Sequence, residues 1–240
     1  MLVAAAVCPC PPLLVPEVAA GAAPELDSVR AACTDALGVL AAARPDLLVV
    51  VGPAEASGSG PRPEGARGSF RGFGVDLEVR LGRDTGTGSG GELPSSLAVA
   101  AWLLACTGWS DAPVAPVEGL GVEESLTPER CAAAGRDLAA RAGRVALLVM
   151  GDGSARRTLK APGYLDERAE PFDTGVARAL GEADTSALRA LDALLAQELK
   201  VSGRAPWQVL AGAAEDAGLS GTLLHEDAPY GVGYLVAAWS

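Results

Sequence analysis

Residues 144–157 read RVALLVMGDGSARR, an unbroken apolar run followed at once by a glycine-rich polar turn. A short, continuous apolar run that ends in turn residues is typical of a strand covered on both faces. Residues 2–7 and 46–51 have the same character, and the segment between them, from about 25 to 43, has helical periodicity. We expect these three strands to be neighbours in one sheet. The turn at 151–157 should then lie at the carboxyl edge, where open α/β sheets bind ligands.

Strand and helix patterns also alternate along the rest of the chain. Helical patterns cover residues 93–107, 127–142, 171–182, 185–199 and 205–217. Further strand patterns cover residues 75–81, 113–117, 222–226 and 233–239. This alternation predicts one three-layer αβα domain over residues 1–240, with a mixed, largely parallel central sheet.

The composition narrows the classes of partner. The chain has 240 residues, 49% of them apolar, which is enough for one sizeable core. A net charge of −11 would repel phosphate backbones, so we do not expect a nucleic-acid partner. No apolar run reaches the roughly 18 residues needed to span a bilayer, and the N-terminus has no basic region of a signal peptide. We therefore expect a cytoplasmic protein without a membrane partner; the sequence indicates no oligomeric state.

Four polar segments follow predicted strands or begin the last helix. They read CPCPP at 8–12, GPAE at 52–55, GDGSARR at 151–157 and SGRAP at 202–206. In a doubly wound fold such segments converge at one edge of the sheet. Arg156 and Arg157 beside a glycine-rich turn suit an anionic small molecule, held through guanidinium and backbone N–H groups. The alternative is a solvated basic loop whose arginines pair with nearby acidic residues.

The order of these motifs resembles the class III extradiol ring-cleavage dioxygenase subunit-B-like family, which includes the Memo proteins. Cys10 stands where that family has a His between two prolines, and Glu55 where it has the His of a Gly-Pro-x-His pattern. Asp152 matches the Asp of a Ser-Asp-x-x-His signature, but Ala155 replaces the His. Ser202 opens an x-Gly-Arg-x-Pro helix start whose first residue is Glu or Cys in relatives. An actinobacterial-type subgroup with GDGSARR and APYGVGY runs resembles the chain more closely still.

The resemblance implies an Fe(II) site and extradiol chemistry, yet the chain lacks the residues for them. Non-haem Fe(II) oxygenases typically hold iron through two imidazoles and one carboxylate. The chain has one histidine, His225, which the resemblance places in a closing strand. What the resemblance and the strand ends together predict is a ligand-binding cleft formed by Cys10, Glu55, Asp152, Ser154, Arg156, Arg157 and Ser202.

Two classes of function remain open. A binding or scaffold protein that keeps the fold without the iron chemistry is the interpretation that the missing imidazoles favour. The alternative is an enzyme on the same scaffold, with Asp152 and Cys10 as candidate catalytic residues. We expect no metal or other cofactor. If a metal binds, Cys10 and Glu55 would hold zinc or copper; otherwise Cys8 and Cys10 are packed thiols in a proline-rich turn.

Overall fold

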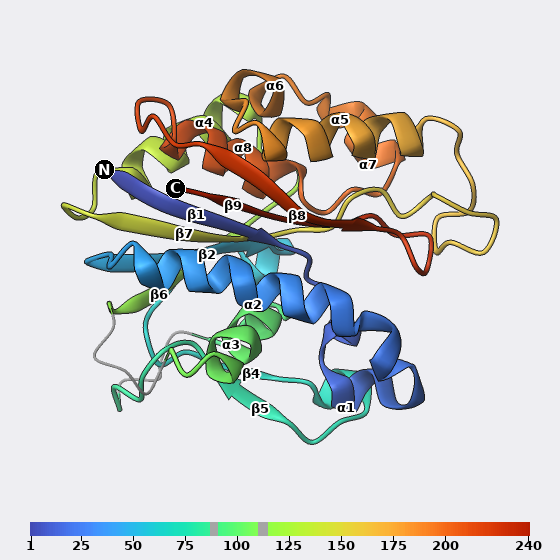
Figure 1. Cartoon of the computed structure of the whole chain (residues 1–240). Helices are drawn as coiled ribbons and strands as arrows, with labels where there is room; N and C mark the ends of the chain where they lie inside the picture. The colour runs from blue at the N-terminus through green and yellow to red at the C-terminus, as the bar shows by residue number, and fades with distance from the viewer. Residues whose placement is uncertain (87–90, 110–114) are drawn as a thin grey trace.

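The computed structural model describes residues 1–86, 91–109 and 115–240 (Figure 1). Its central sheet has seven strands in the order β3-β6-β2-β7-β1-β9-β8. Strands β6, β2, β7 and β1 run parallel, while the pairs β3–β6, β1–β9 and β8–β9 are antiparallel. The strands are β1 (Leu2–Cys8), β2 (Leu47–Pro53), β3 (Gly60–Arg62), β6 (Val117–Val122), β7 (Val145–Met150), β8 (Gly221–Asp227) and β9 (Tyr234–Trp239).

The three apolar segments that decided the predicted fold lie side by side. Leu148 of β7 is opposite Ala6 of β1 on one side and Val50 of β2 on the other. All three residues are fully buried, because β7 is an interior strand with helices over both faces. The predictions that these strands are neighbours, and that the fold is a three-layer α/β arrangement with a largely parallel sheet, are confirmed.

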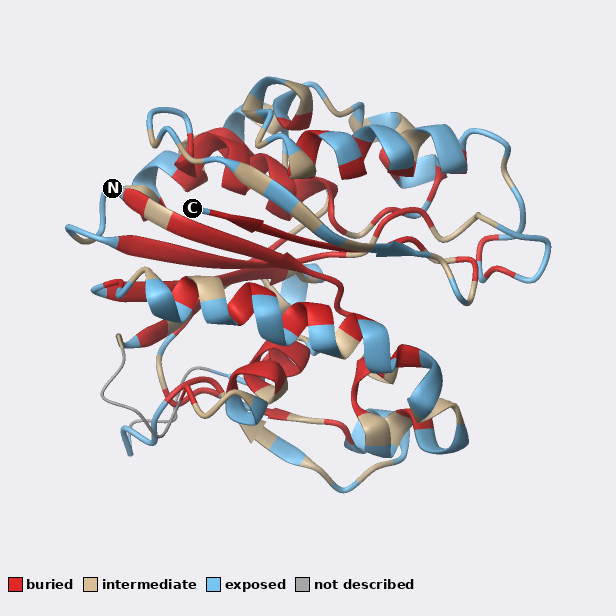
Figure 2. Cartoon of the chain, in the orientation of Figure 1, coloured by how far each residue is buried: buried red, intermediate tan, exposed pale blue. Residues whose placement is uncertain are grey.

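Helices cover the sheet on both sides (Figure 1). One face carries α2 (Asp27–Ala42) and α3 (Ser95–Cys106), with α1 (Pro16–Ala19) and the small sheet of β4 (Arg67–Ser69) and β5 (Glu78–Arg80) on the same side. The other face carries α4 (Pro128–Ala139), α5 (Ala169–Gly181), α6 (Thr185–Arg189), α7 (Ala193–Glu198) and α8 (Arg204–Ala213). Residues 4–8 of β1 alternate between the two cores. Strands β1, β2, β7 and β9 are buried along most of their length, whereas the edge strand β8 is not (Figure 2). Within the described part of the chain, no helix combines the length and apolarity that crossing a membrane requires.

Three predicted elements differ from the structure. Residues 75–81 give only the short β5, which pairs with β4 outside the main sheet. The strand expected at 113–117 instead begins at Val117 as β6, and residues 113–114 lie outside the described part. The two glycines of β6 weaken its strand pattern in the sequence. Gly121 is nevertheless required, because a Cβ there would lie 2.3 Å from the Gly58 carbonyl oxygen. The helix expected at 185–199 is α6 and α7, because Asp192 caps a new helix start.

Candidate functional site

A cleft of about 1070 Å³ opens at the carboxyl edge of the parallel strands. Its walls come from segments that follow β1, β2, β6 and β7, from the end of β3, from the start of α3, from Ser202 two residues before α8, and from the start of β9. The polar side chains among its lining residues are Cys10, Glu55, Ser57, Arg62, Glu92, Ser95, Ser96, Glu123, Glu124, Ser125, Asp152, Ser202, Tyr230 and Tyr234. The edge of the sheet predicted to bind ligands therefore carries a cleft large enough for a small organic molecule.

Asp152 joins three segments of the cleft that are far apart in sequence. The Cys10 backbone N–H donates to Asp152 Oδ1 at 2.7 Å, which ties the segment after β1 to the segment after β7. The Asp152 backbone N–H donates to Ser202 Oγ at 3.1 Å, and the Gly203 N–H donates to the Asp152 carbonyl at 3.0 Å. Three positions singled out by the resemblance thus form one hydrogen-bonded group.

Two glycines allow this group to form. A Cβ on Gly151 would lie 2.4 Å from the Cα of Gly203, and a Cβ on Gly203 would lie 2.2 Å from the ring of Trp207. Real Cβ atoms do not come this close to backbone or packed ring atoms, so both positions require glycine. The start of α8 therefore packs against the end of β7, and Ser202 lies against the backbone of Asp152.

Three groups of this cleft, Asp152, Glu124 and Cys10, have raised pKa values. Burial raises the pKa of half-buried Asp152 to about 7, against the opposing effect of the Cys10 N–H. Burial raises the pKa of Glu124 to about 8, although Arg204 and the Ala205 N–H oppose the shift. Burial, and then the charge of Asp152, raise the pKa of the Cys10 thiol well above its usual range, while the Ser202 hydroxyl lowers it. Cys10 is therefore a neutral thiol rather than a reactive thiolate.

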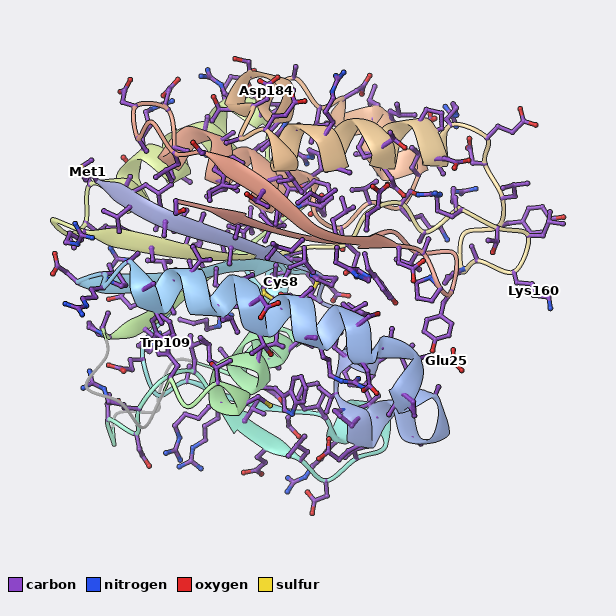
Figure 3. The ribbon with its side chains drawn as sticks, viewed as in Figure 1. Met1, Cys8, Glu25, Trp109, Lys160 and Asp184 are labelled. Carbon is purple, nitrogen blue, oxygen red and sulfur yellow. The ribbon has the colours of Figure 1, made fainter. Side chains whose placement is uncertain are left out.

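Cys8 lies deeper than Cys10, between the sheet and α2 (Figure 3). It is fully buried, and a hydrogen bond with Cys33 is the main reason that its pKa is raised well above the usual range. Buried, protonated thiols support the prediction that Cys8 and Cys10 are packed in the proline-rich turn. On the rim of the cleft, the Tyr230 hydroxyl donates to Glu25 Oε2 at 2.9 Å, joining the turn before β9 to the segment before α2 (Figure 3).

The GDGSARR turn is held by Asp173 of α5, a residue that the sequence did not suggest. Ser154 donates to it twice, from its backbone N–H at 2.8 Å and from its hydroxyl at 2.7 Å. Arg157 Nη1 donates to Asp173 Oδ2 at 3.2 Å. A Cβ on Gly153 would lie 2.8 Å from Asp173 Oδ1. The serine and second arginine of this motif thus bind a buried carboxylate of the protein itself, and Gly153 leaves room for it.

The predicted site residues consequently divide into two sets. Cys10, Glu55, Asp152 and Ser202 line the cleft. Ser154, Arg156 and Arg157 are absent from its lining among the described residues, and Ser154 and Arg157 stabilise the neighbouring turn. Glu124, which follows β6, was not among the predicted site residues, because the strand pattern at 113–117 ends seven residues before it.

The donors in the cleft do not fit the iron that the family resemblance implies. Glu55 is exposed, Cys10 keeps its proton, and Ser202 offers a neutral hydroxyl. His225 lies on β8 and does not line the cleft as the described residues define it. Over residues 1–86, 91–109 and 115–240, no group of three His, Cys, Asp or Glu side chains could hold a metal ion.

Comparison with known proteins finds a likeness to solved structures. No protein-family model matches the chain, and no curated protein matches it. The fold is similar to that of the uncharacterized protein JW3007 from Escherichia coli K12, with a TM-score of 0.56. The two sequences are 16% identical, and the match covers 99% of each chain. At this identity the likeness shows a shared fold over the whole length and nothing about activity.

Replacing Asp173 should destabilise the protein strongly. Asp173→Ala leaves the buried Ser154 hydroxyl and the Arg157 guanidinium without their carboxylate, and we expect a loss of about 3–5 kcal/mol in the free energy of unfolding. Glu170→Ala is the matched control, because Glu170 is exposed and lies 3.5 Å from the same arginine; it should change stability by less than about 0.5 kcal/mol. Urea unfolding of both variants measures the difference. Equal effects would show that Asp173 does not anchor the turn.

Proposed function

We propose that this protein has an extradiol dioxygenase-like fold and binds an organic small molecule in the cleft, without ring-cleavage chemistry. The observation that carries the proposal is the state of the group formed by Cys10, Asp152 and Ser202. These residues line the cleft, Cys10 and Ser202 at positions that the resemblance links to iron and Asp152 beside them, but they hydrogen-bond one another or keep their protons. A protonated thiol, a protonated carboxyl and a neutral hydroxyl donate hydrogen bonds to a ligand, or accept them from it, more readily than they coordinate a metal.

The rest of the cleft fits this role. Small-molecule sites combine a mostly apolar lining with a few polar groups that converge on the ligand. Here the apolar part is formed by Pro11, Pro12, Leu13, Pro53, Leu93, Pro94 and Val232. The protonated carboxyls of Asp152 and Glu124 can donate hydrogen bonds as well as accept them.

Extradiol cleavage would need two features that the cleft lacks among its described residues. Iron in such sites is held by neutral imidazoles, and an imidazole is also the usual proton acceptor. The single histidine of the chain is on β8, and Ala155 stands where the family has its histidine. The lost acid–base group alone would cost about 10²–10⁴ in rate.

The same cleft supports a second candidate function, a metal-free enzyme that uses acid–base catalysis. A general acid or base works best when its pKa is near the working pH. Asp152, with a pKa of about 7, and Glu124, with a pKa of about 8, meet this condition. Both carboxyls line the same cleft, and the charge of each raises the pKa of the Cys10 thiol.

The first proposal predicts the outcome of iron loading. After anaerobic incubation with Fe(II) and desalting, elemental analysis should find far less than one equivalent of iron per chain. Oxygen uptake with catechols should equal that of a Cys10→Ser variant treated in the same way, because no imidazole holds the iron or takes the catechol proton. One equivalent of bound iron with turnover that depends on Cys10 would contradict the proposal.

The second candidate predicts a pH dependence of stability that Asp152 causes. Its carboxyl ionises near pH 4 in the unfolded chain but near pH 7 in the folded protein, so the folded state holds more protons between these values. The free energy of unfolding should therefore fall as pH rises through this window, by up to about 1.4 kcal/mol per pH unit. The side chain in Asp152→Asn cannot ionise, so the free energy of unfolding of this variant should fall less steeply with pH. Relative to the wild type, the variant should therefore become more stable as pH rises.

Asp137→Asn is the matched control, since it removes the same charge from an exposed position on α4. Urea unfolding at several pH values from 4 to 8 compares the three proteins. If Asp152→Asn and the wild type have parallel profiles, Asp152 does not titrate near neutral pH, and the acid–base candidate fails.

A further inference from the structure

Arg62, the last residue of β3, lines the cleft although it is only 9% exposed. Its Nη1 donates to the Pro61 carbonyl at 3.0 Å, while its Nε is buried and has no hydrogen-bond partner. Among the residues that the structure describes, no carboxylate forms an ion pair with it. Arg62 thus brings an uncompensated positive charge into the wall of the cleft.

Arg204, which is buried more deeply than Arg62, and the partly buried Arg157 have side-chain partners that Arg62 lacks. Arg204 Nε also has no hydrogen bond, but it lies 3.9 Å from Glu124 Oε2. Arg204 donates to the Leu126 carbonyl at 2.7 Å and to Gln208 Oε1 at 2.9 Å. Arg157 is paired with Asp173. A guanidinium does not lose its proton in a protein, so an unpaired one keeps its full charge and its desolvation cost. A buried cation of this kind on a cleft wall indicates that its counter-ion is supplied from outside the chain.

The position of Arg62 is set by close packing at the edge of the sheet. It pairs with Gly119 of β6, where a Cβ would lie 3.2 Å from the Arg62 Cβ and 3.0 Å from the side chain of Leu81. The base of the arginine therefore has little freedom to move. Its planar group has the geometry to bind both oxygens of a carboxylate.

We propose that Arg62 is the anion-binding group of the cleft, and that the ligand has a single carboxylate on an apolar body. This inference rests on the proposed function, because it assumes that the cleft binds a small molecule. One negative charge balances one guanidinium. A second negative charge, as on a phosphate monoester, would be repelled by the other acidic side chains of the lining, which are Glu55, Glu92 and Glu123. The apolar body would pack against the prolines and leucines of the same cleft.

The test uses three probes with the same apolar body: 2-naphthoate, 2-naphthyl phosphate and the neutral 2-naphthamide. Binding to the wild type and to Arg62→Met is measured by ligand-observed NMR and titration calorimetry at one ionic strength. Arg178→Met is the matched control, since Arg178 is exposed on α5 and its loss changes the net charge equally. Wild type and Arg178→Met should bind naphthoate more tightly than the other two probes. Arg62→Met should weaken naphthoate binding by about ten-fold to a hundred-fold.

A second measurement does not depend on the choice of probe. If no group of the protein neutralises Arg62, the unliganded Arg62→Met variant should be as stable as the wild type or more stable, because an apolar side chain of similar length costs less to bury. A clear loss of stability would show that Arg62 has a structural partner, and would overturn the inference.

The binding results separate failure of the inference from failure of the proposed function. Val232→Trp fills part of the cleft and should reduce binding of every probe. If naphthamide binds as tightly as naphthoate, and Val232→Trp but not Arg62→Met weakens both, the cleft binds small molecules but Arg62 does not recognise the anion. If the phosphate binds more tightly than naphthoate, the single-carboxylate assignment is overturned. If no probe binds in a way that Val232→Trp reduces, both proposals fail.

Discussion

The backbone contact between Gly151 and Gly203 is the constraint on which the cleft depends. Strand β7 is an interior strand of the sheet, and its first residue beyond the carboxyl end is Gly151. The absence of side chains at both glycines lets the start of α8 pack against this point. The contact brings Ser202 to Asp152, and Asp152 in turn holds the backbone of Cys10. A larger residue at either glycine would separate the segments that form the cleft floor.

This arrangement favours protonated groups in the cleft. Packing α8 against β7 encloses the carboxyl of Asp152, and enclosure raises its pKa because the charged form loses hydration. The same effect acts on the Cys10 thiol and on Glu124. A metal site needs the opposite condition, with ligands that lose their protons readily. The departures from the family pattern at Cys10 and Ser202 are therefore consistent with one another: each replaces a metal ligand with a neutral group.

The main sheet could be predicted from the sequence because buried parallel strands give unbroken apolar runs. Segments that lack this signal could not be placed. Strand β6 contains two glycines that close packing requires, and β3 is three residues long with a proline at its centre, so both resembled loops. Glu124 and Arg62, which follow β6 and end β3, were missed for this reason.

The turn at 151–157 shows a different limit of the sequence. Its basic residues predicted an anion site, but the anion that Arg157 binds is Asp173, which is 16 residues later and belongs to α5. Nothing in the local pattern distinguishes an external ligand from a buried carboxylate of the same chain. Cys10, Glu55, Asp152 and Ser202 could be assigned to one cleft because the ends of parallel strands must meet at one edge.

The central claim is that the carboxyl of Asp152, which lies beside the positions of Cys10 and Ser202 where the resemblance implies an iron site, holds its proton up to near neutral pH. It is tested most directly by carboxyl ¹³C NMR, following the side-chain carbon of Asp152 from pH 3 to pH 10 with Asp152→Asn to assign the signal. We predict a midpoint near pH 7 that Fe(II), added under anaerobic conditions, does not shift. A midpoint near pH 4, or one that iron lowers, would contradict the account.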